Sequence, residues 1–327
     1  MSETLIDPTA IRAADFRAES GSAAPPVLTA HVALKRLIML VNPLSGSVGS
    51  QAAAEARAIL DDYECESSVV ELNHEDFDTR VDAALAAVPD VLIVLAGDGT
   101  AGTIASRAGP EGPLVAPLPG GTMNMLPRAL YDTTDWKVAL RLALEQGTIQ
   151  DVAGGEIRDA EGQHTFYCAA ILGSAALWAP AREAVRTGQL KLAWVYARRA
   201  LRRAFSGRLR YALDGATGRQ TEALVLISPT ISRAVGEDAG LEAAAMNPAD
   251  AGQAMRLAAH ALFKGWRQDP SVRTTATRSA TVRARSRIPA VIDGEPTLLR
   301  HEARIRFIPR AFRALAPNRP AAAGDAA

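Results

Sequence analysis

The stretch VLIVLAGDGT, residues 91–100, constrains the fold more than any other part of the chain. Its first five residues are all apolar, which is typical of a central strand in a parallel sheet covered on both faces. Glycines and Asp98 follow directly, at the strand end where ligands of open α/β sheets bind. The charge of Asp98 would repel a phosphate, whereas it suits Mg²⁺ or a hydroxyl group to be oriented or deprotonated. The stretch therefore predicts an α/β fold with a site at Asp98.

The sequence around this strand alternates short apolar runs with alanine-rich helical segments from residue 35 to about residue 150. This alternation is typical of βαβ units. It predicts strands at residues 36–42, 68–72, 91–95 and 113–117, with helices at 51–60, 76–87, 100–108 and 134–146.

The rhythm changes after residue 150. Strand-like segments separated by turn residues follow one another without regular crossover helices, which predicts an antiparallel second domain. One helix, at about residues 189–205, interrupts them. The predicted organisation is a flexible segment (1–34), an α/β domain (35–150), a β-rich domain (151–317) and a flexible tail (318–327).

Composition narrows the class of protein. The chain has 327 residues, 48% of them apolar, which is enough material for two cores. Its formal net charge is zero, so there is no chain-wide signal for nucleic-acid binding. Cys65 and Cys168 have no metal-ligand spacing and are interpreted as packing residues. No apolar run reaches 18 residues and no signal peptide is visible, so we expect a cytoplasmic protein with at most peripheral membrane contact.

Two further glycine-bearing segments follow predicted strands. VNPLSGS ends in Gly46 and Ser47, and LPGGTMN ends in Asn124. Small residues before a helix offer backbone amides to an anionic group, although NPxSG alone is as often a simple turn. Because three such strand exits share one sheet, we expect the segments to converge on one cleft.

A fourth segment, VIDGEP, lies far along the chain and places carboxylates at Asp293 and Glu295 on either side of a glycine. Asp-Gly is a strong hairpin signal, and a plain turn is the more frequent explanation of this motif alone.

Taken together, VNPLSG, AGDGT, PGGTMN, IDGE and the closing IPRAFRALAP resemble, in order and spacing, the diacylglycerol kinase catalytic-domain family of lipid kinases, which includes sphingosine and ceramide kinases. The resemblance covers roughly residues 35–317. It implies an N-terminal α/β domain like that of NAD kinases and phosphofructokinases, a C-terminal antiparallel β-sandwich, and ATP with Mg²⁺ between them.

The resemblance also implies roles for matching residues. Asp98 and Glu295 are the expected catalytic residues, with Asp98 also expected to hold Mg²⁺. Glu295 is our preferred general base, although the reverse assignment stays open. The expected nucleotide-binding residues are Asn42, Ser45, Gly46, Gly97, Gly99, Thr100, Gly121, Thr122, Asn124 and Asp293.

The chain departs from the family pattern at positions that bear on the substrate. Met125 stands where an acidic residue often follows the asparagine, and residues 172–177 lack the acidic residue that many relatives use for the lipid head group. Diacylglycerol and ceramide, or a related sphingolipid, therefore both stay open as acceptors.

The segment QLKLAWVYARRALRRAF predicts an amphipathic helix with apolar residues on one face and basic residues on the other. Such a helix can lie on an anionic bilayer or pack on its own domain. The resemblance favours peripheral contact with the inner face of the cell membrane. The expected contact residues are Trp194, Arg198, Arg199, Arg202 and Arg203.

Two alternatives to a lipid kinase remain at this stage. A soluble NAD-kinase-like enzyme shares the GDG loop, and a catalytically silent lipid-binding protein could use the same scaffold. The absence of GxxxxGK[ST] argues against a P-loop kinase. Interleaved aromatic residues, which a nucleic-acid partner would require, are lacking on the basic helix.

Overall fold

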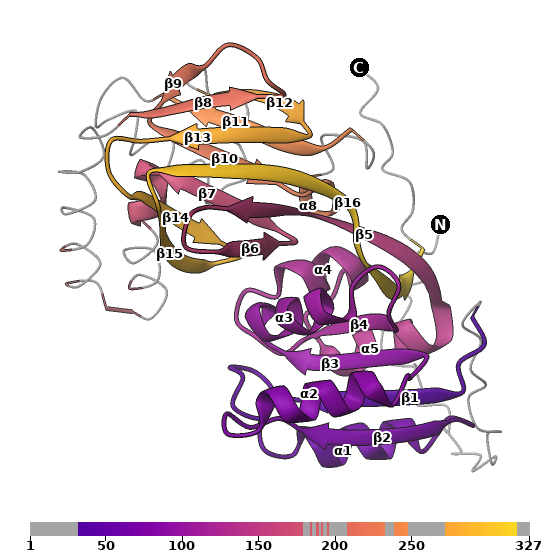
Figure 1. Ribbon diagram of the computed structural model, residues 1–327. Helices are drawn as coiled ribbons and strands as arrows, with labels where there is room; N and C mark the ends of the chain where they lie inside the picture. The colour runs from indigo at the N-terminus through magenta and orange to yellow at the C-terminus, as the bar shows by residue number, and fades with distance from the viewer. Residues whose placement is uncertain are drawn as a thin grey trace, which may run out of the picture.

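A computed structural model describes residues 32–178, 208–232, 239–247 and 272–318, together with five single residues between positions 184 and 195. Its N-terminal part is an α/β domain (Figure 1) whose parallel strands lie in the order β2-β1-β3-β4. The predicted strands are confirmed, with ends shifted by at most two residues. The strands are β1 (Arg36–Val41), β2 (Glu66–Glu71), β3 (Val91–Ala96) and β4 (Leu114–Pro119).

Helices cover both faces of this sheet, and therefore β3 and β4 are buried along their whole length. The helices are α1 (Ala52–Leu60), α2 (Phe77–Ala86), α3 (Asp98–Ala108), α4 (Met125–Tyr131) and α5 (Trp136–Gln146). An ion pair of 3.0 Å between Lys137 and Glu55 joins α5 to α1 on one face. Arg107 joins α3 to α2 on the other face through Asp78 and Asp82.

The second domain is an antiparallel β-sandwich, as predicted. Its core lies between two sheets and contains Ile157, Phe166, Leu224 and Ile305. One sheet is formed by β5 (Gly147–Arg158), β6 (Gln163–Phe166), β8 (Leu209–Leu213), β9 (Arg219–Thr221), β13 (Ser279–Arg283) and β16 (Glu302–Pro317). The other is formed by β7 (Ala169–Gly173), β10 (Ala223–Ile227), β11 (Leu241–Met246), β12 (Val272–Thr277), β14 (Ile288–Ile292) and β15 (Glu295–Leu299).

Short helical turns complete the described part of this domain. The 3₁₀ helix η1 (Ser174–Trp178) follows β7, and α8 (Pro229–Ser232) follows β10. Of the helix expected at residues 189–205, only Gln189, Lys191 and Val195 are described, the last two as helical and exposed. The expected contact residues Trp194, Arg198, Arg199, Arg202 and Arg203 lie outside the described residues, so the membrane contact stays a prediction.

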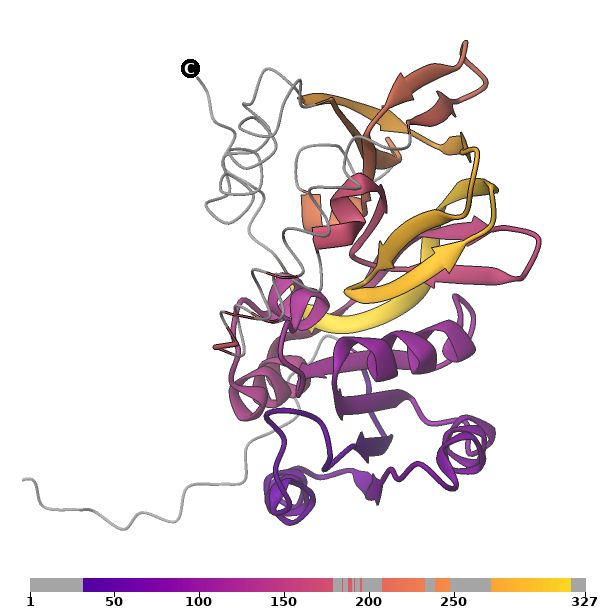
Figure 2. The ribbon, with the colours of Figure 1, turned by 90° about the vertical axis from the view of Figure 1, so that its left-hand side faces the viewer.

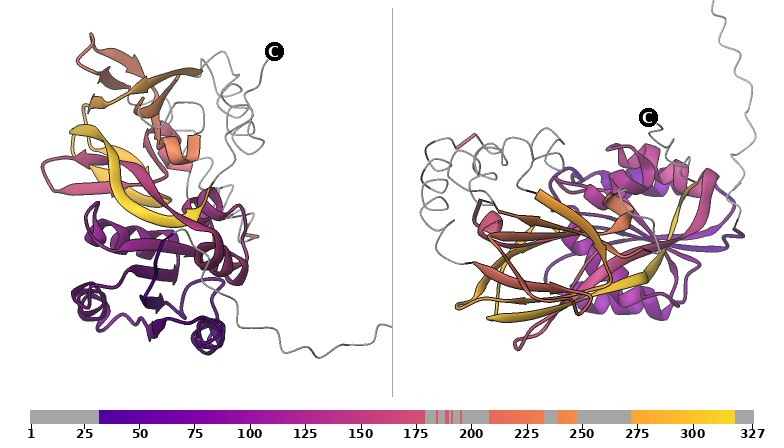
Figure 3. Two further views of the ribbon diagram at one scale, coloured as in Figure 1. Left: turned by 90° about the vertical axis from the view of Figure 1, so that its right-hand side faces the viewer. Right: turned by 90° about the horizontal axis from the view of Figure 1, so that it is seen from above.

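Strands β5 and β16 connect the two domains. They pair along almost their whole length, with a register shift between Ile308 and Phe312. Beyond this shift β16 also pairs in parallel with β4, through Ala314 and Val115, so one sheet continues from the α/β domain into the sandwich. Figures 2 and 3 show the sandwich stacked on the α/β domain, with β16 running from one to the other.

The end of β16 belongs to the core of the first domain. Phe312, Ala314 and Leu315 are fully buried in that core, although they lie in the range assigned from sequence to the second domain. The expected boundary at residue 150 likewise falls inside β5. The physical reason is that β4 would otherwise be an unpaired edge, and β16 covers it.

No helix in the described ranges combines the length and the hydrophobicity that crossing a bilayer requires.

Candidate active site

The three glycine-bearing loops meet at the carboxyl ends of β1, β3 and β4, and hydrogen bonds join them. The Gly97 N–H donates to Ser45 Oγ over 3.1 Å, linking the first loop to the second. The Ser47 hydroxyl donates to the Gly121 carbonyl over 3.2 Å, linking the first loop to the third. The predicted convergence of the loops is thus confirmed. The sequence motif suggests no role for Ser47, whereas the structure shows that its side chain joins the first loop to the third.

Close backbone contacts explain why glycines stand in these loops. A Cβ atom on Gly121 would lie 2.7 Å from Gly97 Cα, and one on Gly120 would lie 2.8 Å from the Ala96 nitrogen. Real Cβ atoms essentially never approach other heavy atoms so closely. Around Gly46 the space is wider, with 3.2 Å to Thr122 Oγ1. Glycine is therefore required at positions 120 and 121 by packing between loops.

Replacing Gly121 with alanine is expected to separate the second and third loops. We expect a loss of about 1–3 kcal/mol in the free energy of unfolding, the usual cost of overpacking, and at least tenfold weaker nucleotide binding. Thermal unfolding and nucleotide titration measure the two effects. Gly162→Ala is the matched control, because nothing lies within 4 Å of a Cβ at this position. Equal behaviour of the two variants would contradict the packing argument.

Two of the predicted nucleotide residues hold the loops in shape through their own side chains. Asn124, which is 6% exposed, accepts a hydrogen bond from the Gly121 N–H at 2.7 Å and donates to the Gly121 carbonyl at 2.9 Å. Asn42 Oδ1 accepts from the Leu44 N–H at 3.1 Å. Asn124 adopts the left-handed conformation (φ 48°), which asparagine tolerates better than most residues. A nucleotide contact by either side chain stays a prediction.

Asp98 is the first residue of α3, and its carboxylate points at the start of α4. Oδ2 accepts a hydrogen bond from the Met125 N–H at 3.4 Å, while the buried Oδ1 has no partner in the part of the chain that the structure describes. Burial raises the pKa of the Asp98 carboxyl, although the N–H groups of residues 124–126 oppose this effect. A buried carboxylate oxygen without a partner is costly unless a ligand satisfies it. Asp98 is therefore ready to bind a cation or a hydrogen-bond donor.

Glu295, from the second domain, faces this loop of the first domain. A Cβ atom on Gly99 would lie 3.9 Å from Glu295 Oε1, so the Glu295 carboxylate reaches the residue that follows Asp98. Glu295 is exposed to solvent. Glu295 thus lies beside the loop that carries Asp98, although almost 200 positions separate them in the sequence. Their shared catalytic role stays a prediction.

The segment IDGE is also a tight turn, because Asp293 and Gly294 join β14 to β15. Both residues have positive φ angles, 46° and 94°, as a two-residue type I′ hairpin requires. The interpretation of this segment as a turn is therefore confirmed, and its functional role stays a prediction.

Asp293 is committed to protein contacts. Its Oδ1 accepts from the N–H groups of Cys168 and Ala169, both at 2.9 Å, and its Oδ2 accepts from Tyr167 N–H at 2.7 Å. Burial raises the pKa of the Asp293 carboxyl, and so does the nearby charge of Asp98, while the three amides oppose the shift. No motif in the sequence indicated this set of amides. The carboxylate anchors the turn that carries Glu295, and a nucleotide contact of Asp293 stays a prediction.

The segment held by Asp293 also packs against α3. The Tyr167 ring would be 3.5 Å from a Cβ atom on Gly102, and it meets the Phe312 ring edge-on with 5.2 Å between centroids. Burial raises the pKa of Tyr167 to about 12. Cys168 is buried with a thiol pKa raised well above its usual value, and both Cys65 and Cys168 are free. The interpretation of both as packing residues agrees with this arrangement.

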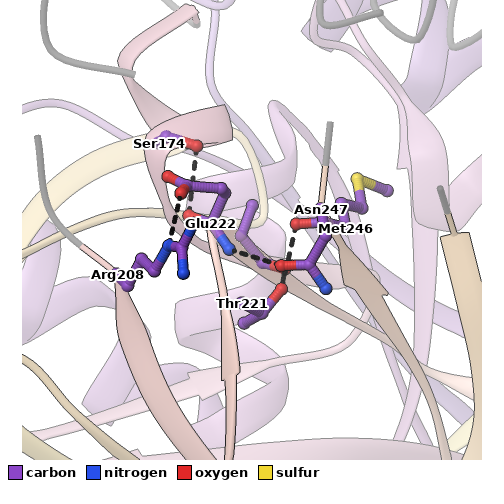
Figure 4. Close-up of polar contacts among 7 residues, drawn as sticks. Ser174, Arg208, Thr221, Glu222, Met246 and Asn247 are labelled. Atoms are coloured by element: carbon purple, nitrogen blue, oxygen red, sulfur yellow. Dashed lines mark hydrogen bonds and ion pairs between the residues drawn. The ribbon is translucent and has the colours of Figure 1, made fainter. Parts of the chain in front are cut away.

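Residues 172–177 contain no acidic residue, but Glu222, which sequence reasoning missed, lies beside Ser174 of this segment. The Ser174 N–H and hydroxyl both donate to the Glu222 carbonyl at 3.0 Å (Figure 4). The Glu222 side chain is 8% exposed and pairs with Arg208 at 3.3 Å, while its Oε2 has no partner among the described residues. Sequence spacing did not indicate the contact with Ser174, because Glu222 directly precedes β10 and reaches Ser174 only through the pairing of β10 with β7.

Comparison with known proteins adds to this geometry. Residues 36–157 match the diacylglycerol kinase catalytic domain. The resemblance stated from the motifs is thereby confirmed. The match to this catalytic domain contains every predicted nucleotide residue except Asp293, and it ends before Glu295. A comparison with curated proteins finds no match.

Solved structures share the fold of both domains. A crystal structure described as that of a diacylglycerol kinase from Bacillus anthracis str. Sterne has a TM-score of 0.60 and 14% identity, covering 87% of this chain and 98% of the other. The yeast NADH kinase complexed with NADH has a TM-score of 0.50 and 13% identity, covering 88% and 85%. At identities this low, the structural similarity shows a common fold and nothing about activity. The match to the diacylglycerol kinase catalytic domain supports a kinase.

Proposed function

We propose that this chain is an ATP-dependent lipid kinase that transfers the γ-phosphoryl group to a hydroxyl of diacylglycerol, ceramide or a related sphingolipid. The observation that carries the proposal is that Glu295, from the second domain, places its Oε1 beside Gly99, the residue that follows Asp98 in the first domain. The match to a diacylglycerol kinase catalytic domain supports the same class of reaction.

The three joined loops are suited to the phosphates of ATP. The first turn of α3 leaves N–H groups without an intrahelical acceptor, and these groups and the helix dipole favour an anion. Gly97, Gly99 and Thr100 allow the phosphates to approach the backbone, while Thr122 is exposed on the neighbouring loop. We assign Asn42, Ser45, Gly46, Gly121 and Asn124 to shaping this site around the nucleotide.

The residues present fit Mg²⁺ as it is used with nucleotides. The described residues contain no group of three or more side chains that could enclose a metal ion. Mg²⁺ commonly needs only one or two carboxylates, because phosphate oxygens and water complete its shell. Asp98, with its unpartnered Oδ1, would supply such a carboxylate. When bound, Mg²⁺ would neutralise charge that develops on the transferring phosphoryl group.

In the proposed reaction the chain mainly positions its substrates. The lipid hydroxyl lies near Glu295, whose carboxylate takes the hydroxyl proton as the oxygen forms its bond to the γ-phosphorus. The bond between that phosphorus and the bridging oxygen breaks, and ADP leaves with the electron pair. Because such transition states are loose, alignment and charge neutralisation contribute most of the rate.

The place of action follows from the proposed substrate. A diacyl lipid or ceramide rarely leaves the bilayer, so we propose a cytoplasmic enzyme associated peripherally with the inner face of the cell membrane. We keep the predicted amphipathic helix around Trp194 as one part of that contact.

The test is transfer of the ATP γ-phosphate, with Mg²⁺, to detergent-dispersed diacylglycerol, ceramide, sphingosine and monoacylglycerol, with NAD as the soluble acceptor. We expect one phosphorylated lipid and no phosphorylated NAD. Phosphorylation of NAD alone would replace the proposal with the NAD-kinase alternative. ATP binding without transfer to any acceptor would contradict these lipids as substrates, and no ATP binding would favour a silent lipid-binding protein.

Asp293→Asn tests how the turn supports the base. Asparagine keeps the positive φ angle and the hairpin, but its amide nitrogen cannot accept the N–H bonds that one carboxylate oxygen accepts. We expect kcat to fall about 10-fold to 100-fold, with the Kd for ATP unchanged, because Glu295 loses its alignment. Weaker ATP binding with unchanged kcat would contradict this positioning role and indicate that Asp293 contacts the nucleotide.

A further inference from the structure

The charge of the chain is divided between its two domains. Residues 35–146 contain eight basic and sixteen acidic residues, a net charge of −8, whereas residues 147–327 contain 26 basic and 16 acidic residues, a net charge of +10. The zero overall charge conceals this division. An electrically asymmetric molecule is oriented by any strongly charged surface that it approaches.

Within the second domain, arginines gather on the outer face of one sheet. Inward-facing residues of the same strands, such as Ile157, Val282 and Ile305, are in the sandwich core. Because side chains alternate along a strand, the residues between them face outward. We call these outward residues the arginine face: Arg158 on β5, Arg210 on β8, Arg283 on β13, and Arg304 and Arg306 on β16. These four strands lie side by side in Figure 1.

The register places like charges directly opposite one another. Arg210 is the partner of Arg283 across β8 and β13, and Arg304 is the partner of Arg158 across β16 and β5. Opposite residues of antiparallel strands have Cβ atoms about 5 Å apart, and like charges there are destabilising. Two such pairs lower the stability of the sheet, so the stability of the fold does not explain why arginines stand at these positions.

Too few carboxylates neutralise this face. Glu302 is shared by Arg283 at 3.0 Å and Arg304 at 3.6 Å. Glu156 is likewise shared by Arg158 at 3.4 Å and Arg306 at 3.3 Å. Five arginines and two glutamates leave a net charge of +3 on a patch about 15 Å across, estimated from the strand spacing of about 4.8 Å. The four paired arginines keep side-chain exposures of 63–78%, so their guanidinium groups are accessible.

We propose that the arginine face docks the protein on the anionic surface of a lipid bilayer. This inference rests on the proposed function in one respect, since a kinase acting on membrane lipids must meet a bilayer. Arginine binds phosphate oxygens through two parallel hydrogen bonds, which suits phospholipid head groups. Opposite Arg306, Arg304 and Arg158 stand Ser279, Thr281 and Gln163. Among the described outward residues of these strands there is no aromatic side chain to stack on bases, as single-stranded nucleic acid would require.

Co-sedimentation of the full chain with vesicles tests this docking. The vesicles are phosphatidylcholine alone or phosphatidylcholine with one third phosphatidylserine. Each arginine near such a surface contributes about fivefold to binding, so the triple variant Arg210→Gln, Arg304→Gln and Arg306→Gln should bind the anionic vesicles about 100-fold more weakly. Added salt should weaken the wild type more than the variant.

The matched control removes the same charge from the first domain, through Arg36→Gln, Arg57→Gln and Arg141→Gln. All three arginines are exposed, and we expect binding to change by less than threefold. Equal losses in the two triple variants would overturn the proposal, because net charge and not the arginine face would then control binding. Wild-type binding to duplex DNA but not to anionic vesicles would also overturn it.

The kinase assay in detergent separates this inference from the proposed function. Both triple variants should phosphorylate dispersed lipid at the wild-type rate, because no bilayer is present. If no acceptor were phosphorylated while vesicle binding still depended on the arginine face, the proposed function would fail and the docking surface would stand. If phosphorylation were normal and vesicle binding ignored the arginine face, the docking surface would fail alone.

Discussion

Replacing Asp98 with asparagine is expected to reduce kcat about 100-fold to 10,000-fold, the range typical of a positioned catalytic carboxylate. The substitution keeps the size of the side chain and its acceptor for the Met125 N–H, but removes the negative charge at Oδ1, which has no partner in the described residues. We also expect weaker binding of Mg²⁺-ATP, with little change for ATP without the metal. Nucleotide titrations with and without Mg²⁺ measure this difference.

The same substitution should leave the fold at least as stable. Burial raises the pKa of Asp98, so the unfolded chain holds fewer protons than the folded one while the pH lies between the two pKa values. Stability attributable to this group therefore falls as the pH rises from the ordinary aspartate range through the raised pKa, and is level above it. Asp98→Asn removes this decline. A thermal unfolding series over pH tests it, and a clearly lower Tm for the variant near neutral pH would indicate a structural role for Asp98.

Replacing Glu295 with glutamine is expected to reduce kcat by a similar factor, but without the weaker binding of Mg²⁺-ATP expected for Asp98→Asn. Glu295 is exposed, so stability should not change, and binding of Mg²⁺-ATP should persist because no proton transfer is needed to bind. Glu111→Gln is the matched control, as its side chain is 81% exposed on the first domain. Normal kcat in Glu295→Gln would remove this residue from the mechanism.

The two variants together decide which carboxylate is the base. Under our assignment only Asp98→Asn weakens the binding of Mg²⁺-ATP. If Glu295→Gln weakened it and Asp98→Asn did not, the roles would be exchanged, with the raised pKa of Asp98 suiting it to accept a proton.

The sequence was sufficient for the α/β domain because its signals are local. Apolar runs such as residues 91–95 and the glycines that follow them report the burial of a strand and the shape of its exit without reference to distant residues. The same locality made Asp98 and the loop glycines visible. The resemblance to a family was needed to connect Glu295 with them, because nearly 200 residues separate the two carboxylates.

What sequence reasoning missed depends on contacts between distant segments. Three backbone amides at residues 167–169 donate hydrogen bonds to Asp293. Almost every residue type has such an amide, so the amino-acid sequence does not reveal these contacts. Glu222 reaches Ser174 only because β10 and β7 pair. The arginine face likewise appears only when the register of four strands is known, since its members are spread over 149 positions from Arg158 to Arg306.

The return of β16 to the first domain has a consequence for the order in which the protein is made. Chains are synthesised from the N-terminus at about 5–20 residues per second, and N-terminal domains usually fold first. Here the α/β domain must wait, because Phe312, Ala314 and Leu315 of its core, and the partner of β4, are made only after the other strands of the second domain. Until β16 has been made, β4 keeps an open edge.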